Sequence, residues 1–433
     1  MRLLLALSLI VTVTILYRPH IRVHRPPNRR TSFDSEKRTQ NNSAAGGNLE
    51  NLLPQWISLL KAAEKAGSTI QETEPSKTHS ETVPRRRRRW WARTREVLRQ
   101  GLIRRVRALD KYSIRSLAGT AENSRVADEG RFQGDGEKVR FLLVTGERPS
   151  VCKSAEGAHA LLQSYKNKVE YCMLHGCKVW YMLESWEEGF YGVWARYPAL
   201  LRLMRSMPSV EWFMWMDADA IFTDLSFSIP FHLYNSWNKH FIAHGFPHLL
   251  YGQEGNWFSL NAGIFLIRNC NWSYTFLEIW RELGKIERRE EAKIAFNNEI
   301  TNRPPDLRAD DQSALIYMLR QLKNATHDFV HTEAAYFLHG YYKLMVHRYE
   351  EMIRRGRENM RDDDQWPFTT HFCGCSFCGS TSEVSHECLH SFTRAYTFAH
   401  NQFLAFANAS LFHPNLNSTG LALNNSPAKS HEY

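Results

Sequence analysis

Two carboxylates separated by one residue follow an apolar segment near the middle of the chain. Residues 210–216, VEWFMWM, are typical of a buried β-strand, and Asp217, Ala218 and Asp219 come directly after them. Carboxylate oxygens are preferred ligands of hard divalent cations such as Mg²⁺ or Mn²⁺, which often bind substrate phosphates as well. A D-x-D triplet also occurs by chance as a pair of solvated turn acids. Its position at a strand end favours a metal site, where a cation could neutralise a diphosphate leaving group.

A second cluster, Asp310, Asp311 and Gln312, precedes the apolar segment 313–322, SALIYMLRQL. Acidic residues at the start of a helix commonly cap its free N–H groups and interact well with its dipole. The functional alternative is that one carboxylate and Gln312 contact a bound substrate. The residues alone leave both alternatives open.

The segment 369–378, TTHFCGCSFC, contains a histidine and three cysteines. Its C-x-C-x₂-C spacing differs from the paired C-x₂-C of structural zinc sites, so we expect disulfides or free thiols rather than zinc. His371 is either a buried core histidine or a third ligand to the cation held by the two aspartates. The even cysteine count permits disulfides without revealing their pairing; the eight are Cys152, Cys172, Cys177, Cys270, Cys373, Cys375, Cys378 and Cys388.

These groups need a scaffold, and the pattern around them is that of an α/β domain. Apolar runs and helical spacings alternate as strand, helix, strand, helix, strand over 139–146, 155–175, 178–184, 194–207 and 210–216. This order predicts a parallel sheet with crossover helices. Ligands of such sheets bind at the carboxyl ends of the strands. The turns at Thr145–Gly146 and Asp217–Asp219 are therefore expected to line the site.

Charge is distributed unevenly. The 433 residues include 55 Lys+Arg and 45 Asp+Glu, a net charge of +10, and residues 85–108 alone hold eleven Arg and one Glu. The rest of the chain is neutral, which argues against nucleic-acid binding by the fold. We expect the basic segment to be a solvated amphipathic helix. Alternatives are contact with an anionic membrane, nucleic-acid binding or a nuclear signal, and proprotein processing at 85–89. Composition excludes a collagen, a small disulfide knot and a polytopic membrane protein.

The N-terminus carries an uncharged, largely apolar stretch from Leu3 to Tyr17. Its length and the missing cleavage motif favour an uncleaved signal anchor over residues 1–17, with a cleaved signal or a buried strand as alternatives. The heavier positive charge on its C-terminal side argues against placing the rest of the chain in the lumen. Six N-x-S/T triplets favour that placement: Asn41, Asn271, Asn324, Asn408, Asn417 and Asn424.

The sequence predicts four regions along the chain. After the anchor, residues 18–137 are expected to be a largely disordered stem that contains one amphipathic helix over 49–66 and the basic segment. Residues 138–405 are expected to form a catalytic domain. Residues 406–433, rich in Asn, Ser and Pro, are expected to be a flexible tail.

Residues of about 139–404 resemble the plant branch of the family-34 glycosyltransferases, which includes xyloglucan xylosyltransferases and galactomannan galactosyltransferases. The stretches that carry the resemblance are FLLVTG, SYKNKVEYCMLHG, WARYP, EWFMWMDADAIFTD, LNAGIFLIRNCNWS, ADDQSALIYML, YFLHGYY, HRYEEMI, WPFTTHFCGC and NQFL. The resemblance implies a GT-A-like, Rossmann-type nucleotide-sugar fold that uses a divalent metal and retains anomeric configuration. It also implies a Golgi location, as a single-pass type II membrane protein with its catalytic domain in the lumen.

The resemblance assigns roles to single residues. It implies that Asp217, Asp219 and His371 bind Mn²⁺ or another divalent cation. The residues placed between donor and acceptor are Asp310, Asp311 and Gln312. Those implied near the UDP moiety are Thr145, Gly146, His339 and Gly340, with Gly374 in the turn after His371.

Three positions depart from the family pattern. Ala218 replaces the usual Ser of D-S-D, so no hydroxyl there can contact the donor sugar, and Arg196 replaces the Lys of W-A-K. Ser376 replaces a Lys that would pair with a phosphate. All three residues are nevertheless expected to lie at the nucleotide-binding site. The loss of that Lys is expected to weaken diphosphate binding unless metal and backbone N–H groups compensate.

The implied reaction transfers an α-linked sugar from a UDP-sugar to a polysaccharide. The acceptor hydroxyl approaches on the face that UDP leaves, and Gln312 stabilises positive charge on the sugar because an amide is a poor nucleophile. We expect UDP-xylose and a β-glucan acceptor, xyloglucan, with UDP-galactose and a mannan as the alternative. Homo- or hetero-dimers with related transferases are expected partners. An inactive scaffold for other Golgi transferases, and a basic membrane- or nucleic-acid-binding protein, are the competing classes.

Overall fold

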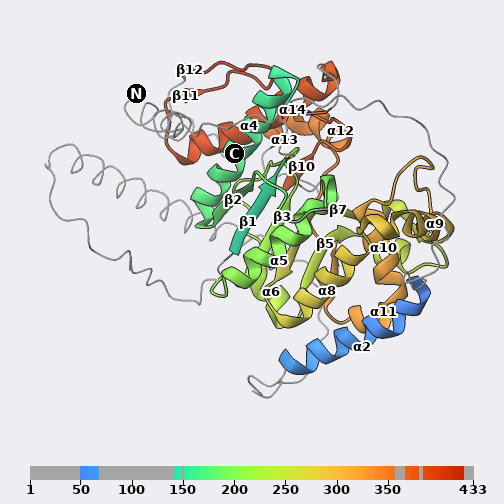
Figure 1. Ribbon diagram of the computed structural model, residues 1–433. Coiled ribbons are helices and arrows are strands. Elements are labelled where there is room, and N and C mark those ends of the chain that lie inside the picture. The colour runs from blue at the N-terminus through green and yellow to red at the C-terminus, as the bar shows by residue number, and fades with distance from the viewer. Residues whose placement is uncertain (1–48, 68–140, 148–150, 356–365, 380–383, 424–433) are drawn as a thin grey trace, which may run out of the picture. The chain divides into compact units, whose positions relative to one another are not determined.

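The computed structural model describes residues 49–67, 141–147, 151–355, 366–379 and 384–423, which belong to one compact unit (Figure 1). The expected anchor, and the stem apart from 49–67, lie outside the described residues, and so does the basic segment 85–108. Among the helices that are described, none combines the length and the apolar character that a membrane crossing requires.

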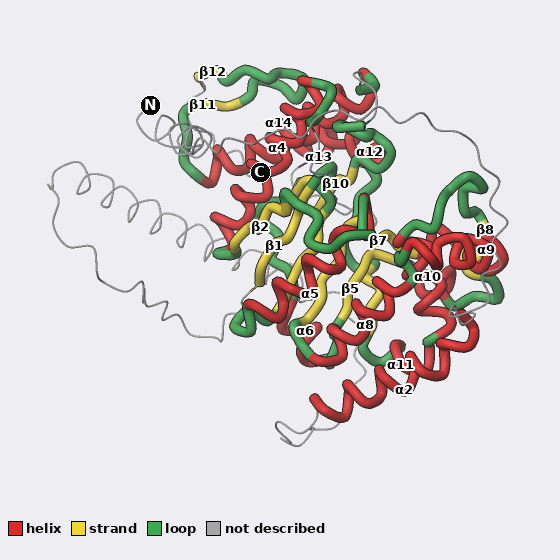
Figure 2. Tube along the Cα trace, in the orientation of Figure 1, coloured by secondary structure: helices red, strands yellow, loops and turns green. Residues whose placement is uncertain are grey.

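A six-stranded sheet forms the centre, in the order β2–β1–β3–β7–β5–β9 (Figure 2). β1 lies between β2 and β3 with both neighbours parallel to it, which confirms the three predicted parallel strands. The strands are β1 (Phe141–Gly146), β2 (Lys178–Met182), β3 (Trp212–Met216), β5 (Phe241–Gly245), β7 (Leu260–Arg268) and β9 (Val330–Glu333).

The sheet as a whole is mixed, because β7 runs antiparallel to both β3 and β5; the sequence pattern predicted parallel pairing only for the first three strands. β7 is an almost entirely buried run, LNAGIFLIR. An apolar run of this kind predicts a buried strand but carries no information about its direction. The α/β class implied by the GT-A resemblance is nevertheless what this mixed sheet and its helices form.

Helices cover both faces of the sheet, and β3 shows why. Its residues are buried on both sides: Phe213 and Trp215 belong to the core shared with α5 and α8, which Figure 1 shows side by side over the sheet, while Trp212, Met214 and Met216 belong to the core shared with α4. The helices of this framework include α4 (Ala155–His175), α5 (Arg196–Ser206), α8 (Asn271–Glu282), α10 (Asp311–Gln321) and α14 (His386–Phe406). The predicted helices at 155–175 and 194–207 correspond to α4 and to α5.

A small antiparallel pair outside the main sheet, β4 (Ala220–Phe222) with β10 (Thr369–His371), joins the middle of the chain to its C-terminal part. His371 is thereby registered opposite Ala220, directly after the D-x-D turn. The remaining elements are η1 (Gly192–Ala195), α6 (Phe231–Ser236), α7 (Pro247–Leu250), β6 (Gly255–Asn256), η2 (Trp257–Ser259), η3 (Ile286–Arg288), α9 (Arg289–Glu299), β8 (Ile300–Thr301), α11 (Lys323–Thr326), α12 (Tyr342–Met345), η4 (Val346–Arg348) and α13 (Tyr349–Arg355).

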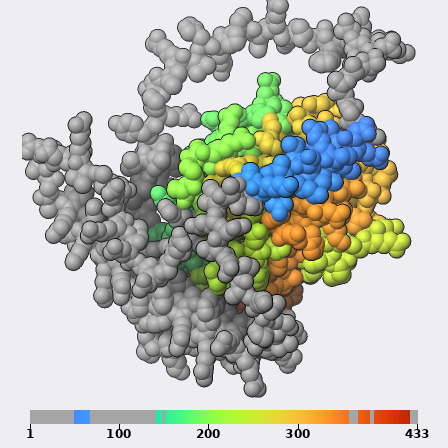
Figure 3. Space-filling view, turned by 90° about the horizontal axis from the view of Figure 1, so that it is seen from below, coloured from blue at the N-terminus to red at the C-terminus, as the bar shows by residue number. Residues whose placement is uncertain are grey.

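The predicted helix at 49–66 exists as α2 (Leu49–Gly67), but it is part of the folded unit rather than of a disordered stem. Its Leu49, Trp56 and Leu60 are buried in the core that includes α8, and α2 contacts α8 and α11. The backbone N–H of Leu49 donates to Glu291 Oε1 at 2.6 Å. Figure 3 shows α2, in blue, lying against the yellow and orange surface. One apolar face of an amphipathic helix is enough to explain this docking.

The flexible tail expected from residue 406 is wrong for the described residues up to 423. After α14, β11 (Leu411–Phe412) pairs with β12 (Ala422–Leu423). His413 between them is buried, exchanges two hydrogen bonds with Asn401 and contacts His400 at 2.8 Å. Polar composition suggested disorder here, whereas these polar side chains find partners on α14. Residues 424–433 lie outside the described part.

Candidate functional site

The structure brings the three predicted metal ligands together. Asp217 and Asp219 flank the turn from β3 to β4, and β10 places His371 beside them. His371 Nε2 lies 3.1 Å from Asp219 Oδ1 and 3.8 Å from Asp217 Oδ2. One ligand atom from each residue falls within 4.8 Å of the others. Two carboxylates and one imidazole form a donor set that suits a hard or borderline divalent cation such as Mn²⁺.

The electrostatics of this group also suit a cation. His371 is 4% exposed, and its Nδ1 has no hydrogen-bond partner. Burial alone would lower the pKa of His371, but the nearby Cys373 and Asp219 raise it well above its usual value. A positive charge is therefore favoured between these acids, and a bound cation can supply it in place of a proton.

Three residues of α4 that the sequence reading left without a role hold the D-x-D turn. Ser164 Oγ donates to the carbonyls of Ala218 (2.6 Å) and Ala220 (3.0 Å). Lys168 Nζ donates to Ala220 O and to Ser164 Oγ, and burial lowers the pKa of Lys168 to about 7 against the opposing influence of Asp219 and Asp217. Asn167 bonds both backbone groups of Phe222. These three polar residues lie at i, i+3 and i+4 on the buried side of the helix, and this spacing could have indicated from the sequence that they act together.

Trp215 and Gly263 were also missed. Trp215 Nε1 donates to Asp217 Oδ1 at 2.7 Å, which fixes the orientation of that carboxylate. A Cβ on Gly263 would lie 2.3 Å from His371 Cε1 and 2.7 Å from Asp217 Oδ2, so glycine alone leaves room for the ligands. The glycine lies in the middle of an apolar strand, where it often marks a close approach.

Arg196 links the metal triad to the second acidic cluster. It is 3% exposed, lies 3.3 Å from Asp217 Oδ1 and 2.9 Å from Asp311 Oδ2, and donates to Ala262 O at 3.0 Å. Asp311 also accepts from Tyr197 Oη at 3.1 Å. Burial raises the pKa of Asp311 to about 6, although Arg196 opposes the shift. Arg196 thus reaches the predicted metal site through Asp217.

Asp310 is the N-cap of α10, which confirms the capping alternative for this residue. Its Oδ1 accepts from Ser313 N at 2.8 Å and its Oδ2 pairs with Arg303 at 3.1 Å. Both carboxylates of the cluster are therefore engaged by protein groups. Their direct contact with an acceptor hydroxyl stays a prediction.

Gln312, at the first turn of α10, is held at both ends of its amide. Its Nε2 donates to Trp257 O at 3.0 Å, and its Oε1 accepts from Asn261 Nδ2 at 3.3 Å and from Ala262 N at 3.4 Å. The last two partners belong to β7, two residues or fewer from Gly263. The side chain is thus oriented by the strand beside the metal ligands, and its proposed role at the sugar stays a prediction.

The residues expected near the nucleotide fall into two groups. Thr145, at the end of β1, is fully buried and its Oγ1 has no hydrogen-bond partner, so its predicted contact with a nucleotide stays a prediction. Two glycines serve packing instead. A Cβ on Gly146 would lie 2.6 Å from Met182 O, and one on Gly340 would lie 2.5 Å from Thr369 O. Gly340 O also accepts from His371 N, so this glycine positions a metal ligand.

The other residues of this group surround the loop after His371. Burial lowers the pKa of His339 well below its usual value, and the neighbouring His371 adds to this, so His339 is a neutral imidazole. Gly374 has φ 86° and Ser376 has φ 44°, and both are exposed. The loop therefore turns back sharply, and Ser376 lies at its surface.

Disulfides hold this loop, which confirms the expectation of disulfides or thiols rather than structural zinc for Cys375 and Cys378. Cys375 pairs with Cys388 at the start of α14, and Cys378 pairs with Cys152 before α4. The third bond, Cys172–Cys177, closes the turn after α4. Cys270 and Cys373 are free thiols.

Comparison with known proteins identifies relatives. The galactosyl transferase GMA12/MNN10 family matches residues 137–382. A probable xyloglucan 6-xylosyltransferase 5 and a xyloglucan 6-xylosyltransferase 4, both of Arabidopsis thaliana, are 43% and 42% identical over 284 residues, 64% of this chain. The chain spans 61% and 54% of their lengths.

A solved structure, that of a galactosyltransferase LgtC in complex with donor and acceptor sugar analogs, is 12% identical. The similarity covers 59% of this chain and 95% of that chain, with a TM-score of 0.33. Because this family matches more than half of its length, the chain belongs to the galactosyl transferase GMA12/MNN10 family, the family-34 glycosyltransferases.

Proposed function

We propose that this glycosyltransferase moves xylose from UDP-xylose onto a β-glucan, with retention of configuration and with Mn²⁺ bound to Asp217, Asp219 and His371. The observation that carries the proposal is the convergence of these three side chains within 4.8 Å at the carboxyl end of β3. Relatives at 42–43% identity that are named xyloglucan 6-xylosyltransferases support the choice of donor and acceptor.

The residues of the chain would act as follows. Asp217, Asp219 and His371 would hold a divalent cation, which would supply positive charge to offset that of the departing UDP. Trp215 and Arg196 keep Asp217 in position, and Ser164 and Lys168 keep the backbone of the turn in position. Thr145 and Gly146 end β1, where the uridine is expected. Gln312, held beside β7, would stabilise positive charge on the sugar while the acceptor enters on the leaving-group face.

The second candidate is an α-galactosyltransferase that uses UDP-galactose and a mannan acceptor. The description of the matched family as galactosyl transferases favours it. The two donors differ by one hydroxymethyl group, so the volume beside the sugar would decide between them.

The same proposal places the catalytic domain in the Golgi lumen, attached through an N-terminal anchor. Three disulfides support an oxidising compartment, because such bonds are rare in reducing cytosol. Protease protection of the folded domain in sealed Golgi vesicles, lost on addition of detergent, is the expected result.

A donor and acceptor matrix tests the activity. Residues 46–433 are secreted from a eukaryotic host and assayed with UDP-xylose or UDP-galactose and with cello- or manno-oligosaccharides. Transfer of xylose to the glucan, lost with EDTA and restored by Mn²⁺, is expected. Asp219→Ala should abolish transfer, whereas Arg205→Met, a change in an exposed ion pair on α5, should not. Galactose transfer to the mannan alone would support the second candidate, and no transfer by a folded sample would favour the scaffold.

A further inference from the structure

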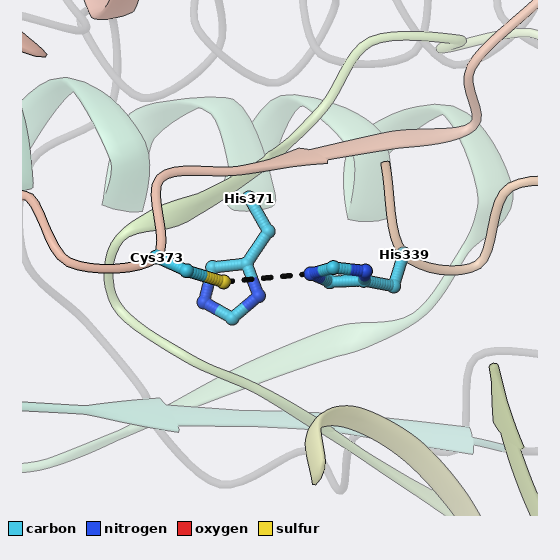
Figure 4. A group of neighbouring side chains, drawn as sticks. All are labelled: His339, His371 and Cys373. Atoms are coloured by element: carbon cyan, nitrogen blue, oxygen red, sulfur yellow. Dashed lines mark hydrogen bonds between the residues drawn. The ribbon is translucent and has the colours of Figure 1, made fainter. Parts of the chain in front are cut away.

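A second group of metal-binding side chains lies next to the carboxylate triad. His339, His371 and Cys373 point toward one another (Figure 4), and one ligand atom from each falls within 4.8 Å of the other two. His339 Nε2 lies 3.5 Å from Cys373 Sγ, and the two imidazole rings meet edge to face with centroids 5.0 Å apart. His371 belongs to both groups.

The distance between two of the three donor atoms fits one tetrahedral ion. Zinc binds thiolate sulfur at about 2.3 Å and imidazole nitrogen at about 2.0–2.1 Å, so the law of cosines at a tetrahedral angle separates sulfur from nitrogen by about 3.5 Å. The observed distance between His339 Nε2 and Cys373 Sγ is 3.5 Å. No rearrangement of these two side chains is needed to bind such an ion.

The donor atoms are also available. Cys375 and Cys378 are committed to disulfides, but Cys373 is a free thiol. His371 is 4% exposed, and its Nδ1 is a buried polar atom with no hydrogen-bond partner. A thiolate with two imidazoles is a softer donor set than two carboxylates with one imidazole, and it selects Zn²⁺ over Mn²⁺.

We propose that His339, His371 and Cys373 form a second cation site that takes Zn²⁺ or a cation of similar softness, and that its occupancy excludes Mn²⁺ from the carboxylate triad. A neutral imidazole offers a lone pair on one nitrogen only, so His371 can serve one ion at a time. Two dications a few ångströms apart would also repel. The exclusion rests on the proposed Mn²⁺ site, whereas the thiol-containing site stands on its own geometry.

Cobalt tests the new site without any assay of transfer. Titration of metal-free protein with Co²⁺ is expected to give one equivalent of a thiolate-to-cobalt charge-transfer band, because only a cobalt–sulfur bond produces it. Cys373→Val should remove the band, and Cys270→Val, which changes the other free thiol, should leave it. Loss of the band in both variants, its persistence in Cys373→Val, or its absence from the unmodified protein would overturn the site. Melting temperatures of both variants establish that they are folded.

Competition tests the exclusion. Electron paramagnetic resonance of the Mn²⁺-loaded protein is expected to show release of free Mn²⁺ when one equivalent of Zn²⁺ is added, and little release from Cys373→Val. Retention of Mn²⁺ with Zn²⁺ bound would overturn the exclusion. Failure of the protein to bind Mn²⁺ at all would overturn the proposed function and the exclusion together, and the cobalt band would still decide the thiol-containing site.

Discussion

Replacement of Arg196 by methionine tests whether the buried guanidinium compensates the charges of the site. Arg196 lies between Asp217 and Asp311, and both it and Asp311 are no more than 5% exposed. Breaking a buried pair by removing one partner costs about 3–5 kcal/mol, because the remaining charge stays without water or counter-ion. The variant also loses the hydrogen bonds from Arg196 to Val193 O and Ala262 O. At about 2 °C per kcal/mol, the melting temperature should fall by roughly 6–10 °C.

The loss should depend on pH in a definite direction. The pKa of Asp311 is about 6 in the folded protein with Arg196 present, and without the guanidinium it must rise further above its unfolded value of about 3.9. A carboxyl group whose folded pKa is raised loses stability as the pH rises toward that pKa. The gap between Arg196→Met and the unmodified protein should therefore widen from pH 6 to pH 8, by up to about 1.4 kcal/mol per pH unit.

Denaturation at both pH values measures the effect, and the same helix supplies a control. Arg205 of α5 pairs with Glu278 at 3.2 Å, but both side chains are more than a third exposed, so Arg205→Met should cost less than about 1 kcal/mol. Adding Asp311→Asn to Arg196→Met should recover part of the loss, because the stranded charge is gone. Equal effects of Arg196→Met and Arg205→Met, or a gap that narrows toward pH 8, would refute the reasoning.

Three further predictions concern separate parts of the molecule. Leu60→Ala in α2 should destabilise the protein by about 2–5 kcal/mol in chemical denaturation, because Leu60 is 1% exposed; the exposed Leu59 is its control. Gly263→Ala should abolish Mn²⁺ binding in a titration while the protein stays folded, since the new methyl group would occupy the space between His371 and Asp217. Ser376→Lys should lower the KM for the UDP-sugar several-fold with kcat unchanged, because it adds a cation beside the expected diphosphate; an unchanged KM would place the phosphate elsewhere.

The residues of the candidate site could be chosen from the sequence, whereas the contacts that hold them in place could not. Asp217 and Asp219 were predictable because an apolar strand ends directly before them, and His371 because of the family resemblance. The role of Arg196 as a buried link to Asp311 depends on the packing of α5 against α10 and β7, which are distant in sequence. No local sequence pattern predicts a contact between residues so far apart in the chain.

The direction of β7 and the docking of α2 could not be predicted for a related reason. The residues of β7 satisfy the same burial in either direction, so only the course of the chain around them makes the strand antiparallel. The amphipathic face of α2 predicted a helix, but the acidic residue that caps it, Glu291, lies in α9 far along the chain. Composition predicted disorder for residues near 413, whose buried histidine finds its partners on α14.

The loop after His371 is held by disulfides, so its structure does not depend on a bound metal ion. Cys375 and Cys378 tie the segment after His371 to α14 and to the residues before α4, so covalent bonds hold the loop whether or not an ion is present. Beside the carboxylates, the buried guanidinium of Arg196 already offsets part of the negative charge. This positive charge also weakens the attraction of the site for a divalent ion. The proposed Mn²⁺ site is therefore expected to exchange its cation with solution, whereas a zinc site that supports a fold would depend on its metal for stability.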